Sequence, residues 1–413
     1  MSRIQESTDL MKKKILFLNM GYFGSTGTIM RDLGMHSSKN GLEPYYVYPE
    51  NPLNKQAISG DIIMENYTEY RIARKLAFLS GLNGCFAVFP TLRLISRIKR
   101  MKPDIIHLHN LHNSYINLFL LFRYLKKSGA AVVWTLHDCW AITGKCPHFQ
   151  YINCEKWKTG CYECPLFKKY PEARVDRTKF LWKCKAKWFI GIPKMTIVTP
   201  SKWLADLTKQ SYLKDYRVKV INNGIDSSIF KARTGNLKNK FEIPEGKYIV
   251  LGVSLDWGFS KGLDIVDKLA KDLDPNYYQI IIVGITENIT EKISERIIKI
   301  QRTDNPEELA ELYSMANVFI NPTREDNYPT VNMEALSCGT PVISFDTGGC
   351  KEQYNNTCGR CIEVDEYDKF KTAVIDICEN HPISQEQCVQ YALHFSKMYM
   401  LEKYMRLYKE SLL

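Results

Sequence analysis

The chain has 413 residues, of which 45% are hydrophobic and 24% are charged, and its formal net charge is +11 at pH 7. This length exceeds what one hydrophobic core usually organises, so two domains are expected. The composition excludes a disordered chain, a collagen and a small disulfide scaffold. The positive charge suits an anionic partner, namely nucleic acid, an anionic membrane surface or a phosphorylated substrate.

The first segment, Met1–Leu10, carries mixed charges and no apolar stretch. It lacks the features of a secretory signal peptide, and we interpret it as a loose leader. Elsewhere no apolar run approaches the ~20 residues of a membrane-spanning helix. These features predict a cytoplasmic protein whose contact with a membrane is at most peripheral.

Short apolar runs rich in β-branched residues alternate with segments long enough for helices. This alternation predicts parallel sheets with crossover helices. The predicted strands fall into two sets, 14–20, 45–48, 104–110, 131–137, 195–200 and 218–222, then 248–253, 279–283, 318–322 and 341–345. Between the sets, residues 223–245 have the composition of an interdomain linker. The sequence therefore predicts an α/β fold of two tandem, doubly wound Rossmann-like domains that face a central cleft.

The most informative segment is 321–349, which reads as strand, loop, helix, strand and loop. Pro329 fits the first position of its short helix, so free N–H groups point into the loop that contains Asp326 and Asn327. Such a helix end attracts phosphate. Glu334 lies among apolar positions of the helix, which predicts a polar ligand for its carboxylate. The alternative is that Asp326 only caps the helix and Glu334 is a solvated surface residue.

This segment resembles the nucleotide-sugar signature of the family-4 retaining glycosyltransferases, which have the GT-B architecture. The family carries two glutamates separated by seven residues, and here Asp326 and Glu334 have that spacing, with Glu325 beside the shorter first acid. The resemblance implies that Glu334 binds the ribose hydroxyls and that Asp326 contacts the transferred sugar. It also implies donor contacts from the residues that follow the first acid, Asn327, Tyr328, Thr330 and Val331.

Two further elements extend the resemblance. Lys261 follows the first strand of the second set, where the family has a lysine on the pyrophosphate, and lysine suits that role as a compact charge on a flexible stem. The second cation that the family often has is absent, because those positions hold Leu255 and Asp256. After the first strand of the chain, the residues Gly24, Thr26 and Gly27 match the family's glycine loop, where glycine allows close approach to a phosphate. The competing interpretations are that Lys261 is an ordinary surface residue and that Gly24 and Gly27 form a plain turn.

Histidines follow two neighbouring strands of the first set. The resemblance implies that His137, at the end of one strand, reaches the transferred sugar. His107 and His109 alternate with the period of a strand, so they point the same way. Because no carboxylate stands near them at ligand spacing, we interpret His109, Asn110 and His112 as polar contacts to an acceptor rather than as metal ligands. The alternative is that His137 has a structural role and forms its hydrogen bonds with the backbone.

The resemblance also divides the chain. Residues 1–225 are expected to form the acceptor-side domain, with a cysteine-rich insertion near 139–170. Residues 226–390 are expected to form the domain that binds the nucleotide sugar, and 391–413 a C-terminal helix that packs back on the first domain.

The insertion contains a cluster of four cysteines within nineteen residues, Cys146, Cys154, Cys161 and Cys164, and the whole chain has thirteen. An odd number of cysteines in a chain without an export signal favours reduced thiols or a metal over disulfides. The final C-x2-C spacing predicts a structural zinc site, in which His148 is an alternative ligand. Four unlinked thiols or an adventitious disulfide are the alternatives.

The segment Tyr70–Lys102 contains eight basic residues and no acidic one. Thr91 is placed to cap a helix in which Arg93, Arg97 and Arg100 share one face. Basic residues beside apolar ones predict docking onto the anionic inner face of the cell membrane, where a lipid-linked acceptor would lie. A solvated face is the ordinary alternative, and nucleic-acid binding is not favoured because no recognition motif accompanies the charge.

The sequence thus predicts a retaining glycosyltransferase that moves a sugar from a nucleotide diphosphate sugar to a saccharide, with a role in bacterial surface polysaccharide implied by the resemblance. No catalytic metal is expected, since Lys261 and backbone N–H groups would stabilise the leaving diphosphate. Two alternatives remain open. One is a nucleotide-sugar 2-epimerase on the same architecture, and the other is a catalytically silent nucleotide-sugar-binding module.

Overall fold

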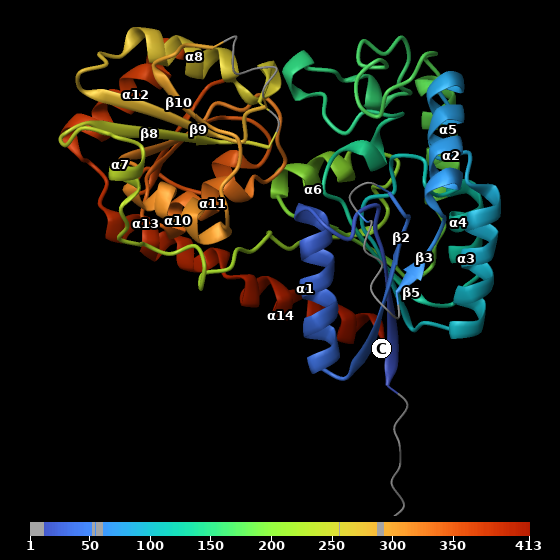
Figure 1. Ribbon diagram of the computed structural model, residues 1–413. Coiled ribbons are helices and arrows are strands. Elements are labelled where there is room, and N and C mark those ends of the chain that lie inside the picture. Colours follow the sequence, from blue (N-terminus) through green and yellow to red (C-terminus); the bar gives the residue numbers. More distant parts are fainter. Residues whose placement is uncertain (1–11, 52–53, 55–60, 256, 287–292) are drawn as a thin grey trace, which may run out of the picture.

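The computed structural model describes residues 12–51, 54, 61–255, 257–286 and 293–413. Met1–Leu10 and Asp256 lie outside them. The chain forms two parallel sheets side by side, each with helices on both faces (Figure 1). The predicted α/β fold with two doubly wound domains is confirmed.

The first sheet has the order β3-β2-β1-β4-β5-β6-β7. Its strands are β1 (Lys13–Leu18), β2 (Leu42–Tyr48), β3 (Ile62–Ile63), β4 (Ile105–Leu108), β5 (Ala131–Thr135), β6 (Met195–Thr199) and β7 (Arg217–Val220). Its helices are α1 (Ser25–Lys39), α2 (Tyr67–Ser80), α3 (Val88–Met101), α4 (Leu118–Leu125), α5 (Thr178–Phe189) and α6 (Lys202–Lys209). Short 3-10 helices lie at Trp140–Ile142, Gln150–Ile152 and Lys156–Lys158.

The second sheet has the order β10-β9-β8-β11-β12-β13. Its strands are β8 (Tyr248–Val253), β9 (Tyr278–Val283), β10 (Ile297–Ile300), β11 (Val318–Asn321), β12 (Val342–Phe345) and β13 (Gly359–Ile362). The helices of this part of the chain are α7 (Leu237–Lys240), α8 (Leu263–Asp272), α10 (Pro306–Met315), α11 (Thr330–Ser337), α12 (Tyr367–Asn380), α13 (Gln385–Ala392) and α14 (Lys397–Ser411). Short 3-10 helices lie at Phe259–Lys261, Cys350–Glu352 and Leu393–Phe395.

Both strand orders reverse once. The reversal lies between β1 and β4 in the first sheet and between β8 and β11 in the second, and both strand pairs are parallel. Ligands of open α/β sheets bind outside the carboxyl ends of the strands at such a switch point. The loops after these four strands are therefore where a site is expected.

Alternate residues of β1 serve the two faces of the first sheet. Leu16 and Leu18 belong to one buried cluster, whereas Ile15 and Phe17 belong to the cluster on the opposite face. This alternation is the period of a strand buried on both sides. It explains why the run reads as continuously apolar in the sequence.

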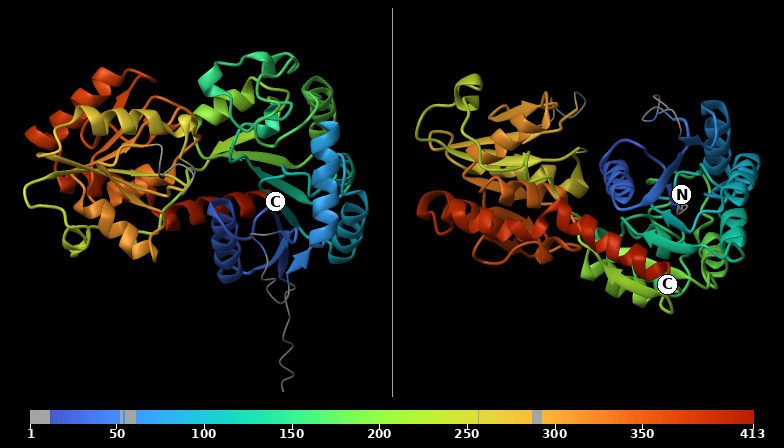
Figure 2. Two further views of the ribbon diagram at one scale, coloured as in Figure 1. Left: turned by 45° about the horizontal axis from the view of Figure 1, so that its top comes forward. Right: turned by 90° about the horizontal axis from the view of Figure 1, so that it is seen from below.

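The C-terminal helix α14 completes the core of the first domain. It runs from the second domain across to the first (Figure 2). Its buried side chains, Met400, Leu401, Tyr404, Met405, Leu407 and Tyr408, share a cluster with Ile15 and Phe17. The crossing is fixed by the backbone, because the Ile225 N–H donates to the Phe395 carbonyl (2.8 Å) and the Lys397 N–H to the Ile225 carbonyl (2.9 Å).

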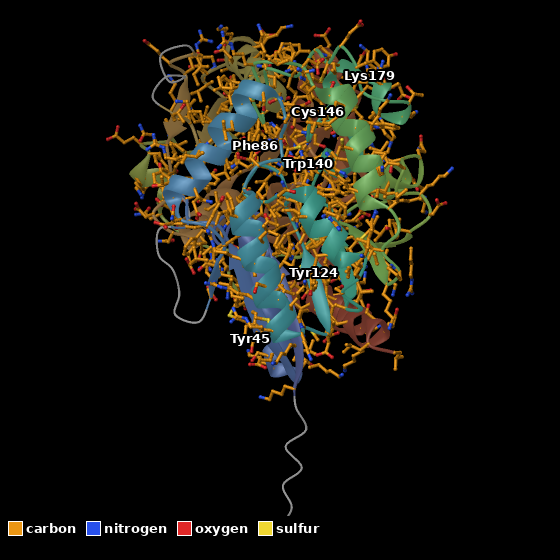
Figure 3. The ribbon with its side chains drawn as sticks, turned by 90° about the vertical axis from the view of Figure 1, so that its right-hand side faces the viewer. Tyr45, Phe86, Tyr124, Trp140, Cys146 and Lys179 are labelled. Carbon is orange, nitrogen blue, oxygen red and sulfur yellow. The ribbon has the colours of Figure 1, made fainter. Side chains whose placement is uncertain are left out.

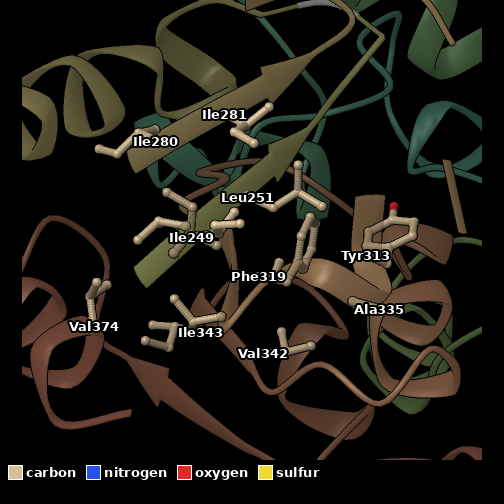
Figure 4. Close-up of a cluster of buried hydrophobic side chains, with 14 of the residues drawn as sticks. Ile249, Leu251, Ile280, Ile281, Tyr313, Phe319, Ala335, Val342, Ile343 and Val374 are labelled. Atoms are coloured by element: carbon tan, nitrogen blue, oxygen red, sulfur yellow. The ribbon is translucent and has the colours of Figure 1, made fainter. Parts of the chain in front are cut away.

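The second domain encloses a separate apolar core (Figure 4). Ile249, Leu251, Phe319 and Ile343 come from its central strands and have no exposed surface. Ala335, from α11, is equally buried. This packing holds α11 in a fixed position beside the end of β11.

All ten predicted strands are present, and three short ones were not predicted. The unpredicted strands, β3, β10 and β13, are edge strands of two to four residues, too short for a clear pattern. Several predicted strands end one or two residues early, including those that end at Leu108 and Thr135. The residues after these ends belong to loops, which is where the histidines lie.

The basic segment folds largely as predicted, with one correction. Thr91 does not cap α3, because the helix begins at Val88 after Ala87. Thr91 is buried inside the first turn and donates its hydroxyl to the Ala87 carbonyl at 2.7 Å. In the part of the chain that the structure describes, no helix is both long enough and apolar enough to cross a membrane.

Candidate active site

Lys261 and Asp326 meet at the switch point of the second sheet. Lys261 ends the turn after β8, and its Nζ lies 2.7 Å from Asp326 Oδ2 and 2.9 Å from the Glu325 carbonyl. Gly262 makes this approach possible. It has a φ of +72°, and a Cβ there would lie 2.2 Å from the Pro322 carbonyl oxygen.

The charges of this pair are stabilised by each other. Burial acts to raise the pKa of Asp326, but the ammonium group of Lys261 outweighs it, and the pKa is lowered. Glu325 behaves differently. Burial raises its pKa to about 7, and its Oε1 has no hydrogen-bond partner among the described residues. Glu325 therefore does not supply a second carboxylate to Lys261 and contributes its backbone carbonyl instead.

Arg324 anchors the loop after β11, and the sequence analysis missed it. Its side chain is 4% exposed and forms two parallel bonds of 2.8 Å to the carboxylate of Asp264. A third bond of 2.8 Å runs from its Nε to Asp365, and its guanidinium lies 3.9 Å from the centre of the Phe259 ring. The planar fork of arginine suits such a site. Arg324 thus ties the turn that carries Lys261 to the loop that carries Asp326.

Glu334 lies on α11, half-buried beside Tyr313. The Tyr313 hydroxyl donates to Glu334 Oε2 at 3.0 Å. Burial raises the pKa of Glu334 to about 7, against the opposing hydrogen bonds from Tyr313 and Thr330. The helix begins one residue later than predicted, at Thr330, because Pro329 is its N-cap.

The predicted donor residues after Asp326 have different positions. Asn327 is buried and contacts the first domain, since its Nδ2 donates to the His137 carbonyl (3.0 Å) and its Oδ1 accepts from the Ser201 hydroxyl (2.6 Å). Tyr328 and Val331 pack with the core of the second domain. Their side chains are thus engaged within the protein, and the donor contacts of Asn327, Tyr328, Thr330 and Val331 stay a prediction.

His137 and His109 form a stacked pair at the end of the first sheet, in which His109 is buried and His137 is half-buried. His109 Nδ1 lies 3.0 Å from His137 Nε2. Burial lowers the pKa of His137 to about 4, with Asp138 acting against burial. His137 is therefore neutral at pH 7. His109 is 1% exposed and supports His137 from behind, and its contact with an acceptor stays a prediction.

His107 belongs to the core. It points to the same side as His109, as predicted, and their rings are 4.2 Å apart. Its Nδ1 lies 2.6 Å from the Tyr408 hydroxyl and its Nε2 2.8 Å from Thr135 Oγ1. It therefore joins α14 to the first sheet.

His112 also lies behind the surface, at 5% exposure. Its Nδ1 is 2.8 Å from the Tyr170 hydroxyl, and its Nε2 is 3.2 Å from Asp138 Oδ2. Both ring nitrogens of His112 thus have partners within the protein, and its contact with an acceptor stays a prediction.

The glycine loop after β1 is held by Asn19, a fully buried residue that the sequence analysis missed. Its Nδ2 donates to Thr26 Oγ1 (3.2 Å), and its Oδ1 accepts from the Asn110 N–H (3.2 Å). Gly24 precedes α1 with a φ of +84° and offers no side-chain cap. A Cβ on Gly27 would lie 2.3 Å from the Tyr22 carbonyl oxygen. The first turn of α1 thus keeps N–H groups that suit an anion.

Contacts between the domains join the loops after β5 and β6 to the loops after β11 and β12. Gln150, in the insertion, donates to the Asp326 carbonyl at 3.2 Å. The N–H groups of Lys202 and Trp203, at the start of α6, donate to the two carboxylate oxygens of Glu352 at 2.7 Å. Together with Asn327, these bonds set the loops after β5 and β11 against each other.

The cysteine-rich insertion brings the four predicted thiols near one another, and the zinc site stays a prediction. The thiols of Cys146 and Cys164 are hydrogen-bonded to each other, and Cys161 Sγ accepts from the Gly144 N–H at 3.2 Å. Cys154 is half-buried. Among the described residues, no group of three or more His, Cys, Asp or Glu side chains is arranged to hold a metal ion.

Two lysines also stabilise this insertion, by hydrogen bonds to its backbone carbonyls. Lys185, 1% exposed, donates to the carbonyls of Trp140 and Thr143 and lies 3.6 Å from the centre of the Trp140 ring. Lys145 donates to the carbonyls of Phe167 (2.6 Å) and Lys169 (2.7 Å). Loop carbonyls that burial would leave unsatisfied thus have lysine N–H donors. Figure 3 views this side of the first domain, with Trp140 and Cys146 labelled.

Comparisons with known proteins agree with this arrangement. Residues 26–229 match the family described as Glycosyltransferase Family 4, and residues 234–395 match Glycosyl transferases group 1. Among curated proteins, the chain is 26% identical over 359 residues to a protein of Escherichia coli K12. The name of that protein describes it as the colanic acid biosynthesis glycosyl transferase WcaC. That alignment covers 83% of this chain and 85% of the relative. An uncharacterised 41.2 kDa protein in the cps region of Klebsiella pneumoniae is 23% identical, covering 94% of this chain and 96% of that protein.

Solved structures share the fold. Sucrose-phosphate synthase from Thermosynechococcus elongatus superposes with a TM-score of 0.70 at 14% identity, over 97% of this chain and 99% of that one. Anabaena Alr3699/HepE in complex with UDP superposes with a TM-score of 0.67 at 13% identity, over 96% and 100%. The two family matches and the paired Rossmann-like sheets lead to one conclusion: the chain belongs to the family-4 glycosyltransferases of GT-B architecture.

Proposed function

We propose that this protein transfers a sugar from a nucleotide diphosphate sugar to a saccharide, with retention of the anomeric configuration, in the synthesis of a bacterial surface polysaccharide. The observation that carries the proposal is the ion pair of Lys261 and Asp326 at the switch point of the second sheet. Glu334 lies on the helix that follows, and the His137 carbonyl is joined to the same loop through Asn327. The names of the relatives, for colanic acid and O-antigen biosynthesis, support the polysaccharide role.

The proposal gives each domain one substrate. Residues 226–390 would bind the nucleotide, with Glu334 accepting the ribose hydroxyls and Lys261 meeting the diphosphate. Residues 1–225 would bind the acceptor and contribute the first turn of α1, with Gly24 and Gly27, to the diphosphate. Residues 391–413 tie the two domains together.

In the proposed reaction, the bond between the anomeric carbon and the diphosphate oxygen breaks. The bond from the acceptor oxygen forms on the same face, and the acceptor proton moves to an oxygen of the leaving diphosphate. Lys261 and the N–H groups of α1 stabilise the charge that grows on that diphosphate, so no catalytic metal is assigned. Neutral His137 orients the sugar by hydrogen bonding and does not exchange a proton at pH 7.

We further propose a cytoplasmic enzyme that docks peripherally on the inner face of the cell membrane, where a lipid-linked acceptor is available. The docking face is formed by α2 and α3, on the side of the first domain away from the second (Figure 1). It combines exposed apolar residues such as Phe89, which is 74% exposed, with the exposed cations Arg97, Lys99 and Arg100. Arg93 contributes less free charge than expected, because it binds Glu69 at 2.7 Å.

Docking is tested by sedimentation with vesicles that contain anionic lipid. Each cation near such a surface contributes ~1 kcal/mol, which salt reduces. Replacing Arg97, Lys99 and Arg100 with Glu should abolish sedimentation, and the same change at Lys231, Lys238 and Arg302 of the second domain should not. Equal sedimentation of both triple variants would contradict the docking face.

The reaction is tested by incubating the protein with UDP-, GDP- and ADP-sugars, with and without an oligosaccharide acceptor, and by following the anomeric protons by NMR. We expect transfer with retention that persists in EDTA. Formation of a 2-epimer from the donor alone would favour an epimerase. Binding without transfer or hydrolysis would favour a silent binding module.

A further inference from the structure

The first domain contains a cavity of about 580 Å³ outside the donor site. Helix α2 forms one wall, and the loop after β4 and the region of Tyr170 form the others. Its volume falls in the range of pockets that hold small ligands. None of the roles assigned above accounts for it.

Three cations of α2 line this cavity, namely Arg71, Arg74 and Lys75. All three are exposed, and of the described residues none forms an ion pair with them. Glu172 is the acid among the lining residues. The lining therefore carries an excess of positive charge, which favours an anionic ligand.

The remaining lining suits a sugar ring. Tyr67, Tyr70 and Tyr170 supply aromatic surface with polar tips. Asn83 also lines the cavity and is 8% exposed, and its Oδ1 has no hydrogen-bond partner among the described residues. A buried acceptor without a donor is costly, and a ligand hydroxyl would satisfy it.

The cavity is connected to the candidate active site by hydrogen bonds. Tyr170 contacts His112 at 2.8 Å, and His112 lies 3.2 Å from Asp138, the neighbour of His137. On the opposite wall, Asn113 donates to the Tyr70 hydroxyl at 2.8 Å. The loops that position His137 thus also form the wall of the cavity.

We propose that this cavity binds the acceptor through a sugar ring that carries an anionic substituent. The proposal rests on the proposed function and narrows its acceptor to a negatively charged saccharide. The negative group is either the carboxylate of an acidic sugar or a phosphate ester, and both would meet Arg71, Arg74 and Lys75.

The test is isothermal titration of the full chain with methyl glucuronide, glucose 1-phosphate and methyl glucoside. We expect the glucuronide or the phosphate to bind at least about tenfold more tightly than the neutral glucoside, and which of the two binds identifies the anionic group. Replacing Arg71 and Arg74 with Ala, or Lys75 with Glu, should remove this preference. The exposed pair Arg302 and Arg406, changed to Ala, is the matched control.

Three results would overturn the inference. They are equal binding of the neutral glucoside, no binding of either anion, and an equal loss of anion binding in Lys261→Ala, which would place the anion at the donor site. Donor hydrolysis without acceptor is measured in parallel and depends on the proposed donor site, which does not include the cavity. Its retention in the Arg71 and Arg74 variant separates failure of this inference from failure of the proposed function.

Discussion

The ammonium group of Lys261 lies 2.7 Å from the carboxylate of Asp326, so the cation assigned to the donor diphosphate is already engaged by an anion. A diphosphate must therefore share Lys261 with Asp326 or displace it. The carboxylate opposes binding of the leaving group while it positions the sugar, and these two effects can be separated by mutation.

Asp326→Asn is expected to tighten binding of the nucleoside diphosphate about fivefold, because it removes a negative charge worth ~1 kcal/mol near the phosphates. Transfer should slow by about tenfold or more, since the sugar loses a positioning contact. Calorimetry and initial rates measure the two effects. Weaker nucleotide binding by Asp326→Asn would refute the competition between the Asp326 carboxylate and the diphosphate for Lys261.

Lys261→Ala removes the cation of the pair instead of the anion. This change should slow sugar transfer more than it weakens nucleotide binding.

Glu334 should make nucleotide binding depend on pH near neutrality. Its pKa is about 7 because of burial, and only the ionised carboxylate accepts hydrogen bonds from both ribose hydroxyls. Affinity should rise as the pH rises from 6 to 8. In Glu334→Gln the affinity for the nucleotide should be weaker and should lose the part of its pH dependence that comes from the carboxylate. A variant with the same pH profile as the unaltered protein would exclude this role.

Arg324→Lys is expected to destabilise the protein by about 1–3 kcal/mol, because lysine cannot replace the paired bonds to Asp264. Transfer should also fall, since the loop of Asp326 loses its anchor. Urea unfolding measures the stability. Arg302→Lys, at an exposed position, serves as the control. Unchanged unfolding in Arg324→Lys would show that the fork is dispensable.

Lys185 predicts that stability depends on pH in the alkaline range. Burial lowers its pKa from 10.5 to about 7, so between these values the unfolded chain binds more protons than the folded one. The free energy of unfolding should therefore rise between pH 7 and 9, by roughly 2 kcal/mol relative to Lys185→Met. Lys187→Met, exposed on the same helix, should follow the unaltered protein. If the free energy of unfolding changed with pH in the same way for the unaltered protein and both variants, Lys185 would not be held neutral.

The strands and the donor motif were predictable because their signals are local. Buried parallel strands read as apolar runs, and Asp326 and Glu334 have their spacing within one loop and helix. The partners of Arg324 are 60 and 41 residues away in the sequence, so the residue reads as an ordinary surface cation. His107 likewise depends on Tyr408, 301 residues later.

The packing of the cysteine-rich insertion also depends on a partner that is distant in the sequence. Cysteine spacing is visible in the sequence, whereas the folding of Lys185 back under the carbonyls of Trp140 and Thr143 is not. Helix α5 must first pack against the insertion before its lysine can serve as the donor. The spacing of the cysteines alone could not reveal that carbonyl groups of the loop have a lysine as their hydrogen-bond donor.

The return of α14 to the first domain affects the order in which the protein folds during synthesis. Tyr404, Leu407 and Tyr408 fill one face of the first sheet, but the ribosome makes them after the whole second sheet. Until then, the growing chain exposes the apolar face that carries Ile15 and Phe17. The first domain to be synthesised is consequently the last to be completed, and we expect a nascent chain halted after β7 to be prone to aggregation.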